Sequence, residues 1–381
     1  MAPMSKRSSS LRAGVRAGAD GVEGAAAAGV GATGATASGA AVAGVSGSSF
    51  LIISTWGGLR TGAAGFGRAE PGGTGRGEAE PPEEEAGAGG CGLPGPAIDT
   101  DQAGISHCKD ANPQDLSSPS QRRLELLPAP AAADLAGRRG STVVWPFGAV
   151  EQHGPHLPLG TDALFSDRVL DAVLQRLPAE APILRLPLQA IGFSPEHRSF
   201  AGTLTLSAEL VLQLVLEVGR GLARTGFQRL VLFNGHGGQI GLLQVAARQL
   251  RDACPELAVL PCFLWSGPEG VWDPIPEPER SQGLHAGLGE TSLMLHLASE
   301  LVGPERPVDG RGGPAIPEGW SLEGAAPCAW LTSDVSSSGV IGDARGASAA
   351  LGEQLFEALV EGWRRRFLSL LTSDWPAPQS H

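Results

Sequence analysis

The chain contains little cysteine. Its five cysteines are an odd number in 381 residues, and no two of them have the Cys-x-x-Cys spacing. A disulfide framework and a zinc finger are therefore both unsupported. This cysteine usage is typical of a reducing compartment, and we expect the protein to be cytoplasmic.

Basic residues are also scarce. The 28 Lys and Arg are outnumbered by 40 Asp and Glu, which gives a formal net charge of -12 at pH 7. Binding to nucleic acid requires clustered cations that neutralise phosphates. The run at residues 364–366 is typical of a solvated helix face and is too small for that purpose. The sequence predicts no nucleic-acid partner.

Long apolar runs are absent as well. Residues 24–59 carry no charge but are mostly Gly, Ala, Ser and Thr, and only residues 50–53 are strongly apolar. A membrane span needs about 20 apolar residues. The early basic residues are followed by Asp20 and Glu23, unlike a secretory signal. We therefore expect no membrane partner.

The composition divides the chain into two parts. Residues 1–123 are rich in Gly, Ala and Pro and show no sustained helical or alternating pattern, which predicts a disordered extension. The sequence leaves open whether this extension is present in the mature protein. Residues 124–381 contain apolar blocks of strand and helix length and are predicted to form a single catalytic domain.

Strands and helices alternate in the second part. Alternation of this kind predicts an α/β fold with three layers (α/β/α) around a mostly parallel central sheet. The predicted strands are residues 141–147, 183–186, 229–233 and 257–260, and the predicted helices are residues 163–177, 207–226, 239–253, 291–302 and 347–370.

A concentration of metal-ligand chemistry follows the first predicted strand. Glu151, His153, His156 and Asp162 place two carboxylates and two imidazoles within a dozen residues. Divalent transition metals prefer these ligands. A packing role would favour apolar residues, since buried polar groups carry a desolvation cost. The segment therefore predicts a metal site.

A second loop follows the strand at residues 229–233 and contains His236 between glycines. It lacks the Lys-Ser/Thr ending of a P-loop and the Gly spacing of a dinucleotide fingerprint. Ligands of open parallel sheets bind at the carboxyl ends of the strands. We therefore expect His236 to meet the Glu151 segment in one crevice.

Two further polar clusters are candidates for the site. His285 and Glu290 lie at the entry to a predicted helix, where Glu290 alone is also explained as a first-turn charge that favours the helix dipole. Glu196 and His197 lie in a loop, and His197 is either a substrate contact or a hydrogen-bonded loop residue. His296 falls within an apolar helix and is predicted to be structural.

Six motifs occur in an order that is found in one enzyme family. They are Glu-x-His at 151–153, Gly-Thr-Asp at 160–162, Ser-Pro-Glu-His at 194–197, Asn-Gly-His-Gly-Gly at 234–238, His-Ala-Gly with Glu-Thr-Ser at 285–292, and Gly-Val-Ile-Gly-Asp at 339–343. Through them the chain resembles the creatininase (creatinine amidohydrolase) family of metal-dependent hydrolases. That family also includes deformylases and peptide-processing members.

The resemblance implies a ligand set. The implied metal ligands are Glu151, His153, Asp162 and His236, with Asp162 as the bridge between two ions. Creatininase itself has an acidic ligand two positions after its last His, whereas this chain has Gly238 there. The departure disfavours creatinine as the substrate and leaves Glu290 as the residue available to complete the ligand set. One or two Zn, Fe or Mn ions per subunit are implied.

The resemblance also implies a reaction. A metal would lower the pKa of bound water, and the hydroxide would attack an amide carbonyl. His285 or Glu290 would protonate the leaving nitrogen, and Glu196 and His197 would contact the substrate. We expect a small cyclic amide or formamide to be cleaved at a non-peptide C–N bond. The alternatives are peptide processing in cofactor maturation and a non-catalytic metal-binding scaffold. The family further implies a homo-oligomer, often a hexamer.

Overall fold

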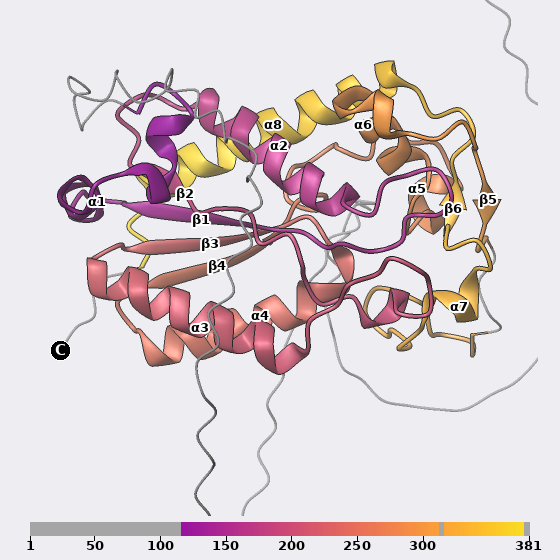
Figure 1. Ribbon diagram of the computed structural model, residues 1–381, viewed down its shortest axis with the longest axis horizontal. Coiled ribbons are helices and arrows are strands. Elements are labelled where there is room, and N and C mark those ends of the chain that lie inside the picture. Colours follow the sequence, from indigo (N-terminus) through magenta and orange to yellow (C-terminus); the bar gives the residue numbers. More distant parts are fainter. Residues whose placement is uncertain (1–115, 312–315, 377–381) are drawn as a thin grey trace, which may run out of the picture. The chain divides into compact units, whose positions relative to one another are not determined.

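A four-stranded sheet lies at the centre of the fold, with strand order β2-β1-β3-β4 and every pair parallel (Figure 1). The computed structural model describes residues 116–311 and 316–376. Strands β1 and β3 pair in the middle over their full length, from Thr142 opposite Arg229 to Phe147 opposite Asn234. The strands are β1 (Thr142–Phe147), β2 (Ile183–Arg185), β3 (Arg229–Asn234) and β4 (Ala258–Phe263).

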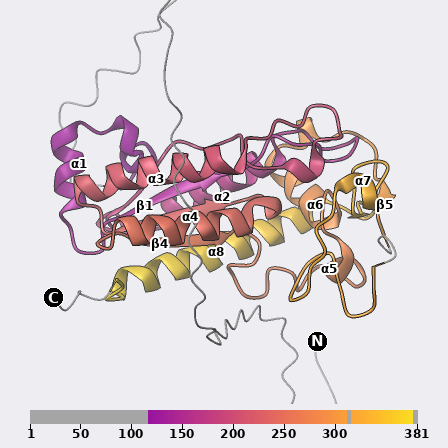
Figure 2. The same cartoon turned by 90° about the horizontal axis from the view of Figure 1, so that it is seen from below.

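Helices cover both faces of the sheet. Figures 1 and 2 show α2 (Thr161–Gln175) and α8 (Ala349–Thr372) on one face, and α3 (Ala208–Thr225) and α4 (Ile240–Ala253) on the other. Successive side chains of a strand point to opposite faces, so each strand contributes to two cores. In β1, for example, Val144 packs with the α2 side while its neighbour Val143 packs with the α3 side. The predicted three-layer α/β/α fold is confirmed.

The sequence signals for helix ends agree with the structure in α3. The Ser207 side chain caps the helix by accepting a hydrogen bond from the Leu210 backbone N–H at 3.3 Å. Gly226 ends the helix with φ of 100°, a left-handed conformation that glycine adopts without strain. The helix predicted at 291–302 differs, because α6 (Leu288–Leu297) begins earlier and is followed by a separate 3-10 turn, η6 (Ser299–Leu301).

Short elements gather at the carboxyl ends of the strands, on the right of Figure 1. Among them, β5 and β6 form an antiparallel pair. These elements are α5 (Glu279–Gln282), α6, α7 (Thr332–Val335), β5 (Val308–Asp309) and β6 (Gly342–Asp343). The remaining elements are α1 (Ala129–Ala136) and the 3-10 turns η2 (Ser120–Arg122), η3 (Leu124–Leu126), η4 (Pro195–His197) and η5 (Gly237–Gln239).

The described part begins before the predicted start of the domain. Leu116 is buried, and the Arg122 guanidinium donates to the carbonyls of Pro178, Ala181 and Ile183. Residues 1–115 lie outside the described part, so a disordered extension stays a prediction for those residues of the predicted 1–123. Among the helices of the described residues, none has the length and apolar character required to cross a membrane.

Candidate metal centre

Two glycines let the start of α2 lie directly against the ends of β1 and β3. A Cβ added at Gly148, after β1, would lie 2.4 Å from the Cα of Ala163, and one at Gly235, after β3, would lie 2.6 Å from the backbone oxygen of Asp162. Side chains at these positions would push α2 away. The two glycines therefore allow Asp162, in the first turn of α2, to reach the residues that follow both strands.

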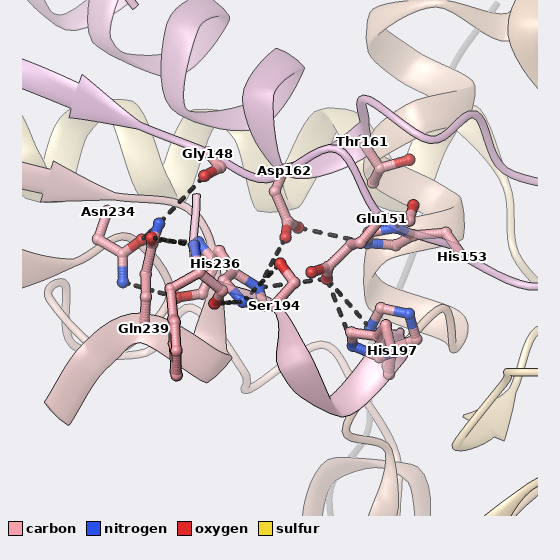
Figure 3. Close-up of polar contacts among 12 residues, drawn as sticks. Gly148, Glu151, His153, Thr161, Asp162, Ser194, His197, Asn234, His236 and Gln239 are labelled. Atoms are coloured by element: carbon pink, nitrogen blue, oxygen red, sulfur yellow. Dashed lines mark hydrogen bonds and ion pairs between the residues drawn. The ribbon is translucent and has the colours of Figure 1, made fainter. Parts of the chain in front are cut away.

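The turn that carries His236 is braced by side-chain amides. Asn234 closes the turn by accepting from the His236 backbone N–H at 2.9 Å and donating to the His236 carbonyl at 2.6 Å. Gln239 donates both to Asn234 Oδ1 at 2.9 Å and to the Gly148 carbonyl at 3.1 Å. These bonds, visible in Figure 3, join the loops after β1 and β3 and fix the His236 backbone.

Asp162 lies between two imidazoles (Figure 3). Its Oδ1 is 3.3 Å from His153 Nε2, and its Oδ2 is 3.1 Å from His236 Nδ1. Glu151 Oε1 is 3.2 Å from the same His236 nitrogen. All four side chains are buried. Asp162 thus presents one oxygen to each imidazole, and its role as a bridge between two ions stays a prediction.

Both imidazoles turn a lone pair toward these carboxylates. His236 Nε2 is 3.0 Å from the Phe193 carbonyl, and His153 Nδ1 is 3.2 Å from the Glu151 carbonyl. A carbonyl only accepts, so these nitrogens carry the protons and the opposite nitrogens are unprotonated in the neutral rings. Lone pairs of nitrogen and carboxylate oxygen then converge, and a metal ion or a proton between them would relieve their repulsion. Metal-binding histidines have this outward hydrogen bond.

Unsatisfied polar atoms support the same conclusion. Both carboxylate oxygens of Glu151 and Nε2 of His153 are buried without a hydrogen-bond partner in the described part of the chain. Such atoms cost free energy unless they are paired or bind a metal. The donor set of Glu151, His153 and Asp162 brings its ligand atoms within 4.8 Å of one another. These residues therefore fit a divalent metal.

The pKa values respond to this crowding of carboxylates. Burial alone would lower the pKa of His153, but attraction to Asp162, Glu290 and Glu151 outweighs burial and raises it to about 9. The pKa of His236 is raised well above its usual value for the same reason, with Glu151 as the strongest attraction. Without a metal, protons are thus drawn to the positions that a cation would fill.

His285 and Glu290 border the centre on the side of His153. Their ligand atoms and that of His153 lie within 4.8 Å of one another. Glu290, in the first turn of α6, uses Oε2 to accept from the Ala286 backbone N–H at 2.6 Å, and Ala286 has a positive φ of 54°. Burial and the repulsion of Asp162 raise the pKa of Glu290 to about 7. Glu290 therefore lies in the first turn of the helix and also borders the site.

Glu196 fills the space next to Gly238. A Cβ at Gly238 would lie 1.6 Å from Glu196 Oε1, and Glu196 Oε1 lies 3.3 Å from His236 Nε2. Glu151, Glu196 and His236 form a further group that could hold a cation. The pKa of Glu196 is lowered, because the His236 ring outweighs the effect of burial. A carboxylate thus stands beside His236 although position 238 has none.

Other histidines and aromatic residues have different positions. His156, next to the ligand motif in sequence, turns to Thr291 Oγ1 at 2.9 Å. His197 is buried, with Nε2 3.5 Å from Glu151 Oε1, so it lies at the site, and its contact with a substrate stays a prediction. His296 packs on Phe356 with ring centroids 5.1 Å apart, as expected of a structural residue.

Sequence reasoning missed Gln152 and Thr332, which contact His197 Nδ1 at 2.8 and 2.7 Å. Gln152 lies inside the Glu-x-His motif, and its position there was the available signal. Trp265 is buried in the core and stacks on Trp272 with ring centroids 5.1 Å apart.

The fold and the site together define an α/β enzyme with a carboxylate and histidine cluster at the carboxyl ends of parallel strands. The chain belongs to the creatininase family, because residues 126–367, more than half of the sequence, match the family model described as creatinine amidohydrolase. It is thus a hydrolase of this family, and the predicted membership is confirmed.

Individual relatives have different names. The chain is 38% identical over 239 residues to the mycofactocin precursor peptide peptidase of Mycobacterium tuberculosis, a match that covers 59% of this chain and 84% of that protein. It is 31% identical over 231 residues to the creatinine amidohydrolase of Pseudomonas putida, covering 57% of this chain and 85% of that protein. A solved creatininase variant of the Zn-Zn type is similar with a TM-score of 0.54 and 25% identity, covering 66% of this chain and 98% of that one.

Proposed function

We propose that this chain is a metal-dependent hydrolase that cleaves an amide C–N bond in a peptide. The observation that carries the proposal is the buried set of Glu151, Asp162, His153 and His236, whose lone pairs converge where a metal ion or a proton would relieve their repulsion. When bound, a divalent metal supplies Lewis-acid polarisation and lowers the pKa of water. We assign Zn, Fe or Mn to these ligands, with one or two ions per subunit.

Two observations support a peptide as the substrate. The match to the mycofactocin precursor peptide peptidase has 38% identity, against 31% for the creatinine amidohydrolase. In addition, Gly238 replaces the acidic ligand that creatininase is expected to have, and Glu196 occupies the adjacent space. The chain departs from creatininase at the centre itself, so a different substrate is the simpler reading.

The remaining chemistry is assigned to residues around the ligands. His285 and Glu290 carry the proton between water and the leaving nitrogen, because both border the cluster beside His153. Glu196 and His197 contact the substrate from the other side, next to His236 and Glu151. A small cyclic amide or formamide is the second candidate substrate, favoured by the match to creatinine amidohydrolase. A homo-oligomer remains a prediction.

The test combines metal analysis with a substrate panel. Full-length protein is purified, its metal content is measured by mass spectrometry, and hydrolysis of short peptides, creatinine and formamides is followed. We expect stoichiometric metal and cleavage of peptides, and we expect Glu151→Ala and His236→Ala to lose both. His296→Ala is the matched control, since this histidine packs on Phe356 away from the cluster.

The outcomes separate the candidate functions. Cleavage of creatinine or formamides without peptides would favour the small-molecule candidate. Metal binding without any hydrolysis would favour a metal-binding scaffold. Unchanged metal content in both Glu151→Ala and His236→Ala would overturn the assignment of the centre.

A further inference from the structure

Gln152 lies between two predicted ligands and is almost fully enclosed, with 5% of its surface exposed. Its backbone carbonyl is 2.7 Å from His285 Nε2. Its side-chain Nε2 is 3.0 Å from the Gly339 carbonyl and 2.8 Å from His197 Nδ1, and its Oε1 is 2.9 Å from the Gly154 N–H. A single residue therefore contacts two of the imidazoles at the site.

The orientation of the Gln152 amide is determined by two backbone groups. The Gly154 N–H can only donate, so it requires the amide oxygen. The Gly339 carbonyl can only accept, so it requires the amide NH₂. If the amide oxygen and nitrogen were exchanged, the NH₂ group would face the Gly154 N–H and the oxygen would face the Gly339 carbonyl. Neither hydrogen bond could then form. The second N–H of the same NH₂ group consequently points at His197 Nδ1.

His197 Nδ1 must then accept. With its lone pair used there, the neutral ring carries its proton on Nε2. That nitrogen faces the centre, 3.5 Å from Glu151 Oε1. A ring nitrogen that carries a proton is a donor and cannot bind a metal. His197 is therefore a donor, although its ligand atoms and those of Glu151 and His285 lie close enough together to hold an ion.

The other three imidazoles present a nitrogen lone pair to the centre, whereas His197 presents an N–H. His153, His236 and His285 each lie within hydrogen-bond distance of a backbone carbonyl through one nitrogen, so in the neutral ring the opposite nitrogen is unprotonated. For His285 this is Nδ1, which lies 4.0 Å from Glu151 Oε1. His197 and His285 stack with ring centroids 4.2 Å apart, so a donor and an acceptor lie side by side.

We propose that Gln152 is a positioning residue that fixes the Nε2–H tautomer in both of these stacked rings, so that opposite groups face the centre: His197 donates its Nε2–H to the carbonyl oxygen of the substrate while His285 presents the lone pair of Nδ1 to take up a proton. The part that concerns the substrate depends on the proposed function. The tautomers do not, because they follow from the hydrogen bonds of the free protein.

The tautomers are measured directly in the full-length chain. Protein labelled with ¹⁵N-histidine, prepared with chelator and with Zn²⁺, is sedimented and analysed by solid-state ¹⁵N NMR, which works for an oligomer of any size. His197→Gln identifies the His197 signals. We expect Nε2–H with unprotonated Nδ1 for His197 in both preparations. A proton on Nδ1 of His197 in the wild-type chain would overturn the proposal, whether or not Gln152→Glu folds.

A variant tests the part played by Gln152. In Gln152→Glu a carboxylate replaces the amide and can only accept, so His197 should acquire a proton on Nδ1. Thr332→Val is the matched control: it removes the other contact to Nδ1, made by the Thr332 hydroxyl at 2.7 Å, and retains the amide. We expect the wild-type tautomer in Thr332→Val. A shift of the proton in Thr332→Val, with no shift in Gln152→Glu, would assign the control of the tautomer to Thr332 instead.

Kinetics then test the donor role on a peptide that the wild-type chain cleaves. Removing one such donor lowers kcat by about 10²- to 10³-fold in other enzymes, and we expect a loss of this order in His197→Leu with unchanged metal content. His197→Gln keeps an N–H near the position of Nε2 and should recover part of kcat. Loss of metal in His197→Leu would show a ligand role and overturn the proposal. If the wild-type chain cleaves no amide, the proposed function fails while the tautomer result stands.

Discussion

Adding a carboxylate at Gly238 tests whether Glu196 occupies the space of the acidic ligand that creatininase is expected to have. The added Cβ of Gly238→Glu would lie 1.6 Å from Glu196 Oε1 and 2.7 Å from His236 Nε2. Both distances are shorter than real contacts, so Glu196 must leave its position before a side chain can fit. The variant therefore brings two carboxylates into competition for one place beside His236.

The expected loss of stability has two parts. Two like charges about 4 Å apart repel by roughly 4 kcal/mol at the effective dielectric of a protein surface. Inserting atoms into a filled space costs about 1 to 3 kcal/mol more. We therefore expect Gly238→Glu to lower the free energy of unfolding by on the order of 5 kcal/mol. The double variant with Glu196→Gly relieves both effects and should recover most of this loss.

The assay is a double-mutant cycle on the free energy of unfolding, measured in urea with chelator and with added Zn²⁺, together with metal content. Gly237→Glu is the matched control, because a Cβ at the neighbouring Gly237 meets nothing within 4 Å. For residues in contact, coupling energies of about 0.5 to 3 kcal/mol are usual. Because the double variant should recover most of a loss of about 5 kcal/mol, we expect a value above that range. Additive effects, or a Gly238→Glu variant as stable as Gly237→Glu, would refute the reasoning.

Three further predictions concern packing, pH and metal removal. Gly219→Ala in α3 should lower the free energy of unfolding in urea by about 1 to 3 kcal/mol, because its Cβ would lie 2.1 Å from the buried Leu250 side chain. Gly221→Ala should instead be stabilising by up to about 1 kcal/mol, because its Cβ would meet only Arg224 Nη2, at 3.8 Å. Burial, followed by the charge of Arg306, lowers the pKa of His156 from 6.5 to about 4. As the pH falls, the unfolded chain therefore binds the proton before the folded chain does. The stabilisation is fully present above pH 6.5 and is lost toward pH 4, by at most about 3 kcal/mol. His156→Gln should flatten this dependence when the free energy of unfolding is measured across that pH range. Chelation should lower the melting temperature, by the equivalent of about 2.7 kcal/mol if the metal had been present at 100 times its Kd, and an unchanged melting temperature in protein of known metal content would contradict a buried metal site.

The convergence of the site was predictable because it depends on a general property of parallel sheets. The apolar pattern located β1 and β3, and parallel strands place their carboxyl ends at one edge. Glu151 and His236, far apart in sequence, could therefore be expected to meet, and their contact at 3.2 Å agrees. The ligand residues near Glu151 could be recognised because they lie close together in the sequence.

The direction of each side chain within a loop was not predictable. His153 and His156 are three residues apart, yet His153 faces Asp162 while His156 faces Thr291. No period relates side chains in a loop, since the backbone there follows tertiary contacts. The contact between Glu196 and Gly238 depends on two loops that meet only in the folded chain. Gln152 was passed over because an amide carries no charge and has no signature of its own.

The site consists of two groups of residues that differ in how they are held. Glu151 and His236 lie in the loops that follow β1 and β3, Asp162 lies in the first turn of α2, and the glycines at 148 and 235 let these segments approach one another. His285 is held differently, through backbone hydrogen bonds with Ile341 beside β6. Asp309 of β5 accepts hydrogen bonds from Ser336, Ser337 and Ser338, in the loop that leads to Gly339.

Gln152 joins the two groups, because its side chain binds the Gly339 carbonyl while its neighbours on either side belong to the ligand cluster. On the proposed function, Glu151, Asp162 and His236 would therefore keep a cation in one place while the loops around His285 and Gly339 change. Relatives named as a peptide peptidase and as a creatinine amidohydrolase both match this chain over more than half of its length. Differences of substrate on that shared part are expected in the loops, and on the proposed role of Gln152 a shift of those loops would change the hydrogen bond to His197.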